Sequence, residues 1–349
     1  MKAPVLTKYR RIVWQDIPDP FPTPTGVVVK VNYASICGSD EHVFRGDFHP
    51  RTKLPFVQGH EFAGIIVAKG KRVKKAKIGE RVAVDPIFWC GKCAACEKGH
   101  HQACATLKLL GIDVNGGFAE FVAAEEFMLY PVPDSVSEKD AALVEVLSIG
   151  LHACNRSGIQ KGDTAAIFGA GKIGQVILQA AMNRTKKDLF IIDTLDSRLS
   201  IAKNVLSRVH VINAAKENPV EKILELSKGR GVDIAFEAVG HAHPIPGQFL
   251  PVRQCIQAIR QGGSVCVLGL SDKPVPLVMK ELIWKEAKLL TSRVTAGEFS
   301  EALRLMAFKK LFPNKLVTDE MPASKTQRAF ELLEKEPEKH LKILIKPGI

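Results

Sequence analysis

The stretch 89–104 reads WCGKCAACEKGHHQAC and holds four of the eight cysteines of the 349-residue chain. These cysteines are Cys90, Cys93, Cys96 and Cys104. Four thiolates complete the tetrahedral coordination of Zn²⁺ and leave no position for water or substrate, which is typical of structural zinc sites. The sequence therefore predicts a structural zinc ion here. His100 and His101, between the third and fourth cysteines, are expected to be exposed loop residues.

A second, dispersed set of residues has the composition of a catalytic zinc site. ICGSDEH contains Cys37, QGHEF contains His60 and Glu61, and LVEVLSIGLHAC contains Glu145. One thiolate, one imidazole and one carboxylate, either Glu61 or Glu145, would leave a fourth position open, as catalytic zinc requires. Each residue alone is weak evidence, because a buried cysteine is usually a small hydrophobic residue. Spacing along the chain does not show that these residues meet.

The segment IFGAGKIGQVILQAA contains Gly169, Gly171 and Gly174 as G-x-G-x-x-G, with Lys172 and Ile173 inside the loop. The first glycine follows an expected strand and the third lies in an expected helix, which is the context of a dinucleotide-binding turn. In such a turn the N–H groups at the helix N-terminus bind the pyrophosphate. The sequence therefore predicts that this loop binds a dinucleotide cofactor.

Asp193 ends the next expected strand, at the interval of about 20 residues that belongs to this fingerprint. Its carboxylate would accept hydrogen bonds from the adenosine ribose and repel a 2′-phosphate, so we predict NAD rather than NADP. Arg198 is the opposing signal, because a nearby arginine can accommodate that phosphate. We interpret Arg198 as a surface helix charge that packs over the adenine.

The elements that must position these residues fall into two kinds. From residue 27 to about residue 130, short Val/Ile/Ala-rich runs are broken by Gly and Pro, which predicts a β-rich unit. A helix is expected over 137–150, with Ser137 as its N-cap. From residue 162 onward strands alternate with helices, which predicts right-handed crossovers and a parallel sheet covered on both faces.

In the last stretch, 293–349, we expect helices over 298–308 and 326–334, followed by the apolar strand LKILI. That strand could return to the β-rich unit.

Composition limits the class of protein. Hydrophobic residues make up 46% and charged residues 25%, and the absence of an apolar run near the roughly 18–20 residues of a membrane span predicts a soluble globular protein. The N-terminal segment lacks the apolar core of a secretory signal, so we expect a cytoplasmic location. Net charge is +12, much of it in KGKRVKKAKIGER, but three Tyr and three Trp offer few stacking platforms. We therefore interpret the basic run as a solvated turn and expect no nucleic-acid or membrane partner.

Several motifs follow one another in a fixed order: C-G-S-D-x-H, G-H-E-F-x-G, the four-cysteine stretch, D-x-N-G-G-F-A-E-F, a Glu-containing helix with GLHA, and GAGKIG. In this combination the whole chain resembles the zinc-dependent medium-chain dehydrogenase/reductase family. It is most similar to the polyol branch, which comprises the sorbitol, galactitol-phosphate, butanediol and sugar-acid dehydrogenases. The resemblance implies an α/β protein with a Rossmann doubly wound parallel sheet domain, 151–289, inserted into a β-rich GroES-like catalytic domain, 1–150 and 290–349.

The resemblance also assigns the zinc residues. It places Cys37, His60 and Glu61 on the catalytic zinc, and Glu145 beside the metal, where it can ligate directly or through water. This chain has Val146 where the family often has Pro, which puts the reach of Glu145 in doubt.

Further roles are implied by the same resemblance. Ser39 and His42 match a proton relay, and Arg293 matches a position that faces polar substrates, with a strand-end salt bridge as the alternative. Phe118 either lines the substrate pocket or belongs to the core. Glu237, at the end of a later strand of the parallel sheet, is expected near the nicotinamide.

The implied reaction is the reversible oxidation, with NAD, of a secondary alcohol in a polyol, sugar acid or sugar phosphate. Two zinc ions per chain and a homodimer or homotetramer are expected. The alternatives are a threonine or diol dehydrogenase, a zinc-free quinone or enoyl reductase, and a zinc-stapled nucleic-acid-binding or redox-sensing protein.

Overall fold

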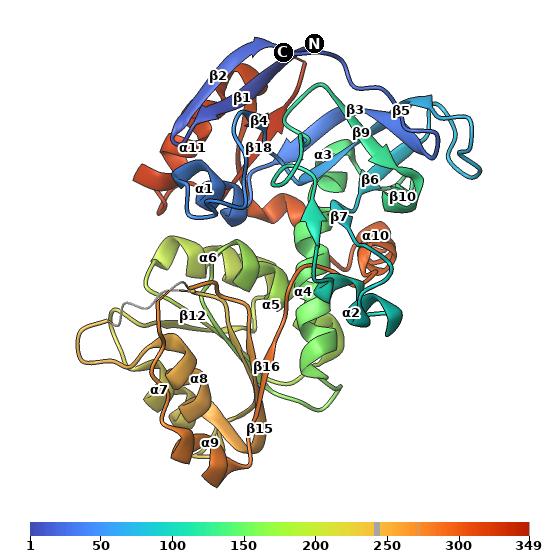
Figure 1. The fold of residues 1–349 in the computed structure, drawn as a ribbon. Helices are drawn as coiled ribbons and strands as arrows, with labels where there is room; N and C mark the ends of the chain where they lie inside the picture. Colours follow the sequence, from blue (N-terminus) through green and yellow to red (C-terminus); the bar gives the residue numbers. More distant parts are fainter. Residues whose placement is uncertain (241–244, 272, 349) are drawn as a thin grey trace. The chain divides into compact units, whose positions relative to one another are not determined.

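The computed structural model describes residues 1–240, 245–271 and 273–348 (Figure 1). The chain divides into two compact units. Unit 1 comprises Met1–Ser148, Thr295–Lys309 and Leu316–Ile349, and unit 2 comprises Ile149–Val294 and Lys310–Lys315. Unit 2 is therefore an insertion in the sequence of unit 1. Within the part of the chain that the structure describes, no helix is both long and apolar enough to cross a membrane.

Unit 1 is built on β-sheets, as the Gly- and Pro-broken apolar runs predict, and its strand pairs are antiparallel except for one parallel pair at the edge of the larger sheet. The smaller sheet has the order β2-β1-β4, from β1 (Lys2–Lys8), β2 (Arg11–Asp16) and β4 (Phe56–Val57). The larger sheet has the order β10-β6-β5-β3-β18-β17, and β9 also pairs with β3. Its strands are β3 (Gly26–Ser35), β5 (Glu61–Lys69), β6 (Arg81–Val84), β9 (Phe121–Glu125), β10 (Leu129–Pro131), β17 (Val317–Pro322) and β18 (Lys342–Lys346).

The central strand of unit 1 is β3, which pairs with β5, β9 and β18 and is buried along most of its length. Its last residues, Ala34 and Ser35, lie opposite Ile345 and Leu344 of β18. This pairing confirms the expectation that the apolar strand LKILI returns to the β-rich unit. The helices that precede β18, α10 (Phe299–Ala307) and α11 (Thr326–Lys335), agree with the expected ranges within a residue at each end.

The helix expected over 137–150 is two helices, α3 (Glu138–Ala141) and α4 (Val144–Ser157). Ser137 caps α3 as predicted, because its Oγ accepts the N–H of Asp140 at 3.1 Å. The N–H of Leu143 then bonds to the carbonyl of Asp140, an i→i−3 contact that tightens the turn and ends α3. A single continuous helix was therefore the wrong prediction, and α4 also runs beyond residue 150.

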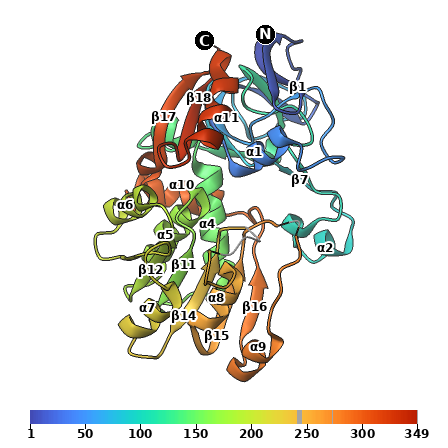
Figure 2. The ribbon, with the colours of Figure 1, turned by 90° about the vertical axis from the view of Figure 1, so that its left-hand side faces the viewer.

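Unit 2 contains a parallel sheet with the order β13-β12-β11-β14-β15-β16 (Figure 2). Its strands are β11 (Ala165–Phe168), β12 (Leu189–Asp193), β13 (His210–Asn213), β14 (Val232–Glu237), β15 (Ile259–Val267) and β16 (Lys288–Thr291). Between them run α5 (Lys172–Arg184), α6 (Asp196–Val205), α7 (Pro219–Leu226), α8 (Pro251–Ala258) and α9 (Met279–Lys285). The order reverses between β11 and β14, which confirms the expected doubly wound sheet and marks the edge where such sheets bind ligands.

One face of this sheet packs against α7, α8 and α9. The side chains of Phe168 and Phe190 share a buried cluster with Ile223, Ile256 and Leu282 from those helices. The sequence predicts a helix over about 247–260, and α8 is shorter than this range. Proline at its first position fixes its start, and the chain turns extended at residue 259 to enter β15.

A buried carboxylate joins the returning segment to the β-rich core of unit 1. Asp85 follows β6 and accepts hydrogen bonds from Ile87 N–H at 3.3 Å and Thr295 Oγ1 at 3.2 Å. Burial raises the pKa of Asp85 from 3.8 to about 6, and the charge of Glu298 adds to this, while the two hydrogen bonds oppose it.

Replacing this carboxylate should make stability less sensitive to pH. Because the folded pKa of Asp85 is raised, the folded state binds its proton more tightly, and the free energy of unfolding falls as pH rises from about 4 to about 6. We expect Asp85→Asn to be more stable than the parent by about 1–2 kcal/mol at pH 7, the ionisation penalty less one weakened hydrogen bond. Urea unfolding at pH 7 and at pH 5 measures the difference.

The control for this experiment is Asp134→Asn, which alters an exposed carboxylate. It should change stability by less than about 0.5 kcal/mol at either pH. An Asp85→Asn variant less stable than the parent at pH 7, or one whose advantage is the same at pH 5, contradicts the assignment.

Candidate active site

The register of two strands brings the dispersed ligand set together. Ser35, the last residue of β3, lies opposite Glu61, the first residue of β5. Cys37 follows β3 as the N-cap of α1 (Gly38–Arg45), and His60 directly precedes β5. One ligand atom from each of Cys37, His60 and Glu61 lies within 4.8 Å of the other two, and all three side chains are buried. Local spacing could not reveal this arrangement, since the strand pairing creates it.

The donor set and its unpaired atoms fit a zinc ion. Thiolate, imidazole and carboxylate are the ligands of catalytic zinc sites. Oε1 of Glu61 and Oε2 of Glu145 are buried without a hydrogen-bond partner in the part of the chain that the structure describes. Buried polar atoms almost always have a partner, so these two oxygens indicate a cation that would satisfy them. We name Cys37, His60 and Glu61 the three-ligand group.

Asp40 contacts two members of this group, Cys37 and His60, and sequence reasoning missed it. It is fully buried at the third position of α1, where Oδ2 accepts the N–H of Cys37 at 2.9 Å. Its Oδ1 lies 3.3 Å from Nδ1 of His60, which is an ion-pair distance, and among the described residues Nδ1 has no partner with hydrogen-bond geometry. Metal-binding histidines usually give their other ring N–H to such a carboxylate. Burial lowers the pKa of His60, but the charges of Asp40 and Cys37 outweigh it and raise that pKa well above 6.5. An acidic residue three positions after a candidate N-cap was the available signal.

The second carboxylate, Glu145, stands apart from the three-ligand group. It lies in the first turn of α4 and is 5% exposed. Burial raises its pKa to about 8, and the neighbouring charge of Glu61 adds to this, whereas His60 opposes it. No oxygen of Glu145 lies within 4.8 Å of all three ligand atoms of the group. Val146, in place of the expected proline, is fully buried.

The residues that match a proton relay share one helix. Ser39 and His42 lie three positions apart on α1, a spacing that puts both on one face. Nδ1 of His42 is 2.8 Å from Oδ2 of Asp47 and 3.1 Å from Nη2 of Arg45, and its ring stacks on Phe48. Burial would raise the pKa of Asp47, but the hydrogen bonds from His42 and Arg45 lower it. With Nδ1 occupied, Nε2 is the ring nitrogen left for proton transfer.

The aromatic candidate for a substrate contact lies in the core. Phe118 is 1% exposed, and its ring packs edge-on against Phe330 with centroids 6.3 Å apart. It also packs on Gly59, where an added Cβ would lie 2.6 Å from the ring. These contacts favour the core interpretation of Phe118 over the substrate interpretation.

The cysteine stretch forms a compact group of four thiols. The stretch is flanked in the sequence by β7 (Ile87–Phe88) and β8 (Lys108–Leu109), which pair with each other in antiparallel orientation. The short helix α2 (Ala94–Glu97) lies within the stretch. The Sγ atoms of Cys90, Cys93, Cys96 and Cys104 all lie within 4.8 Å of one another. No disulfide joins them. Backbone N–H groups of Ala105 and Cys96 lower the pKa of the Cys93 thiol to about 6, which favours the thiolate that binds zinc.

The two histidines of this stretch differ. His100 is exposed, as expected. His101 is half-buried in a 3₁₀ helix, His101–Ala103, and its ring stacks on Trp89 with centroids 4.5 Å apart. The expectation of an exposed loop residue was therefore wrong for His101, because the aromatic neighbour covers one face of its ring.

The basic run of unit 1 is organised by one acidic side chain. Oε1 of Glu126 accepts the backbone N–H groups of Lys74, Lys75 and Ala76, and these bonds lower the pKa of Glu126. Three backbone donors of the run are thus satisfied within the chain. This favours the interpretation of the run as a solvated turn.

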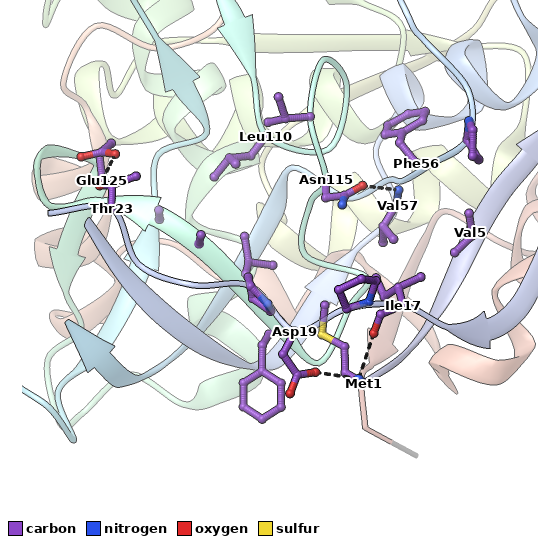
Figure 3. Close-up of a pocket in the computed structure, with 18 of the residues that line it drawn as sticks. Met1, Val5, Ile17, Asp19, Thr23, Phe56, Val57, Leu110, Asn115 and Glu125 are labelled. Atoms are coloured by element: carbon purple, nitrogen blue, oxygen red, sulfur yellow. Dashed lines mark hydrogen bonds and ion pairs between the residues drawn. The ribbon is translucent and has the colours of Figure 1, made fainter. Parts of the chain in front are cut away.

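Unit 1 has a cavity of about 610 Å³, which is lined mainly by residues of 15–23, 55–57, 110–115 and β9 (Figure 3). At its edge the α-ammonium of Met1 donates to Oδ1 of Asp19 at 2.6 Å, and Asn115 Oδ1 accepts the N–H of Val57 at 2.9 Å. The sequence-predicted site residues are not among those that line it. The cavity is therefore separate from the three-ligand group.

In unit 2 the glycine loop has the geometry that the motif requires. Gly169 has φ +101°, which only glycine adopts readily, and it turns the chain from β11 toward α5. A Cβ on Gly174 would lie 1.7 Å from the carbonyl oxygen of Gly169, so the packing of α5 needs this glycine. Gly171 caps α5, and Lys172 and Ile173 form its first turn, where the N–H groups can bind an anion.

The acidic residue at the end of β12 binds both flanking loops. Oδ2 of Asp193 accepts the N–H of Ala170 at 2.7 Å, and Oδ1 accepts those of Thr194 and Leu195. Nη1 of Arg198 lies 3.7 Å from Oδ2 of Asp193. Asp193 therefore partly balances the charge of Arg198. This contact argues against the interpretation of Arg198 as a dedicated ligand for a 2′-phosphate.

The remaining predicted residues of unit 2 lie at strand ends. Glu237 ends β14, and its Oε1 accepts the N–H groups of Val239 at 2.8 Å and Gly240 at 3.0 Å. β14 is the neighbour of β11, so Glu237 and the glycine loop share one edge of the sheet. Arg293 follows β16 and is exposed.

Comparisons with known proteins extend over both units. The family model described as alcohol dehydrogenase GroES-like domain matches residues 23–134, and the model described as zinc-binding dehydrogenase matches residues 173–307. The chain is 31% identical to sorbitol dehydrogenase of Bacillus subtilis (strain 168), with 100% of this chain and 98% of that protein covered. It is 32% identical to D-arabitol-phosphate dehydrogenase of Enterococcus avium, with 93% and 91% covered.

Similarity to solved structures is equally extensive. The crystal structure of the RspB alcohol dehydrogenase from Escherichia coli CFT073, complexed with NADH, matches with a TM-score of 0.89 at 29% identity, and 99% of each chain is covered.

The two metal-binding groups should respond differently to loss of one thiol. We expect Cys37→Ser to remain folded, to retain one zinc ion instead of two, and to lose activity, because only the open site is damaged. Cys96→Ser should first lose solubility or oligomeric order, because the four-thiol group ties down a loop. Zinc per chain, circular dichroism and light scattering measure these outcomes.

The control is Cys154→Ser, which alters a buried cysteine outside both groups and should retain both ions. A Cys96→Ser protein that is folded, fully loaded with zinc and merely inactive would show that the roles of the two groups are assigned wrongly.

Proposed function

The chain belongs to the zinc-dependent medium-chain dehydrogenase/reductase family, in its polyol dehydrogenase branch, and from this we propose that it reversibly oxidises a secondary alcohol of a polyol, sugar acid or sugar phosphate to the ketone, with NAD. The observation that carries the proposal is the buried three-ligand group of Cys37, His60 and Glu61. A zinc-free quinone or enoyl reductase has no use for such a group. A zinc-stapled nucleic-acid-binding protein does not need a glycine loop of this geometry.

When bound, zinc would supply a Lewis acid for the alcohol oxygen, and NAD would accept the hydride. Cys37, His60 and Glu61 would hold the metal, with Asp40 orienting the imidazole of His60. Ser39 and His42 would carry the proton outward, and Asp47 would keep Nδ1 of His42 occupied. Glu145 would stay beside the metal as the alternative carboxylate.

In unit 2, we infer that the N-terminus of α5 and the glycine loop bind the cofactor pyrophosphate and that Asp193 receives the adenosine ribose. Arg198 would then pack over the adenine. Glu237 would lie near the nicotinamide, and Arg293 would face a polar substrate.

The substrate class rests on two supports. Relatives include a sorbitol dehydrogenase and a D-arabitol-phosphate dehydrogenase, so polyhydroxylated compounds with and without phosphate are candidates. A net charge of +12 favours the approach of anionic substrates. Threonine and simple diols are the alternative within the family. We further infer a cytoplasmic homodimer or homotetramer.

A substrate panel tests the proposal directly. Steady-state oxidation of polyols, sugar acids, sugar phosphates, diols and threonine, each with NAD and with NADP, should show turnover of a polyol, sugar acid or sugar phosphate, with the higher kcat/KM for NAD. Turnover of threonine or a diol alone would favour the alternative. If a zinc-loaded sample oxidised none of these secondary alcohols, the dehydrogenase proposal would be lost.

Cofactor choice should depend on Asp193. Asp193→Ser removes the charge that would repel a 2′-phosphate and also a ribose hydrogen-bond acceptor, so we expect kcat/KM with NAD to fall by roughly 10- to 100-fold while that with NADP rises. Asp196→Ser, an exposed change in the first turn of α6, is the control and should leave the NAD to NADP ratio within about twofold. An unchanged ratio in Asp193→Ser contradicts the role of this carboxylate.

A further inference from the structure

A lysine is buried beside the three-ligand group. Lys342 is the first residue of β18 and is 0% exposed. Its Nζ donates to the carbonyl of Ile36 at 3.2 Å and forms an ion pair with Oε2 of Glu61. A fully buried lysine is rare unless it is paired, because removing an ammonium group from water is costly. Lys342 therefore owes its position to the carboxylate that it contacts.

The two oxygens of Glu61 have different surroundings. Oε2 accepts both the Nζ of Lys342 and the Oγ of Ser35, and all three side chains are fully buried. Oε1 has no hydrogen-bond partner among the described residues. Protein groups thus saturate one oxygen and leave the other available.

We propose that Lys342 is a positioning residue for the zinc centre: together with Ser35 it occupies Oε2 of Glu61, fixes the carboxylate and leaves Oε1 as the oxygen that binds the metal. This inference rests on the proposed function, because it needs a zinc ion at Cys37, His60 and Glu61. It accounts for a choice that the sequence leaves open, since two carboxylates compete for one position. The charge of Lys342 also acts on Glu145, but among the described residues no hydrogen-bond donor contacts Oε2 of Glu145. Lys342 thereby makes Glu61 the resting ligand.

Removal of Lys342 from this buried site should weaken metal binding. A partner that holds a metal-bound carboxylate changes metal affinity typically by about 10- to 100-fold when it is removed. Removal of Lys342 would also leave Glu61 as a buried charge with only Ser35 as a protein partner, free to rotate or to yield its place to Glu145. A purely structural role, in which Lys342 only balances the charge of Glu61, would instead lower stability without altering the metal site.

The test compares Lys342→Met and Lys342→Arg with Lys346→Met, a control on the same strand whose side chain lies over the ring of Tyr33. Co²⁺ replaces zinc in the three-ligand group, while the four-thiol group keeps its zinc. The electronic absorption of Co²⁺ reports the ligand set, and competition with a chelator reports affinity.

We expect Lys342→Met to lose the metal about 10- to 100-fold more readily and to shift the cobalt bands. Lys342→Arg should restore much of the parent spectrum, because it keeps the charge and the donor. Lys346→Met should match the parent, and the four-thiol zinc should be retained throughout. If Lys342→Met does not fold, Ser35→Ala removes the other contact to Oε2 and should shift the spectrum in the same direction by a smaller amount.

Parent-like cobalt bands and chelator resistance in folded Lys342→Met would overturn the inference, as would a loss of stability that is equal with and without metal. If Lys342→Met does not fold, a parent-like spectrum in Ser35→Ala has the same meaning. These readouts need no alcohol substrate. Failure of the substrate panel with the expected cobalt shifts would therefore reject only the proposed reaction, whereas a parent chain that binds no metal at this group would reject both.

Discussion

The antiparallel register of β3 against β5 is the constraint on which the zinc centre depends. It sets Ser35 opposite Glu61, so the chain leaving β3 and the chain entering β5 meet at one edge of the sheet. A slip of one residue would turn Glu61 to the opposite face. Irregularities between Val28 and Val29, and between Val31 and Tyr33, help to fix the pairing, because bulges occupy defined places in a ladder.

Once the register is set, burial gives the contacts around the ligands their strength. Charges that would be screened in water interact strongly in a dry site, and each must find a partner. Asp40 of α1 contacts His60 and Lys342 of β18 contacts Glu61, so the imidazole and the carboxylate are each approached by a charged group from a different element. The site is thus assembled by α1, β5 and β18 together, and no single motif could build it.

Features with a local cause could be predicted from the sequence. The four-cysteine stretch and the glycine loop depend on short spacings along the chain. The alternation of expected strands with expected helices indicated the parallel sheet. Lys342 escaped notice because its role arises from pairing between distant strands, whereas Asp40 had a local signal, an acidic residue three positions after an N-cap, that was overlooked. The break between α3 and α4 was missed because a single i→i−3 hydrogen bond decides it. The stacking of His101 on Trp89 was missed because the spacing of these residues along the chain does not indicate a contact.

The place of β18 in the sequence has a consequence for synthesis. The strand that brings Lys342 to Glu61 follows the whole of unit 2, so a ribosome must finish the dinucleotide-binding unit before the β-rich unit can close. Because domains tend to fold as they emerge, unit 2 can be complete while β3 still lacks a neighbour and Glu61 its counter-charge. During that interval the exposed edge of β3 is open to association with other chains and to chaperones. The order of translation thus makes the metal centre one of the last parts of the molecule to mature.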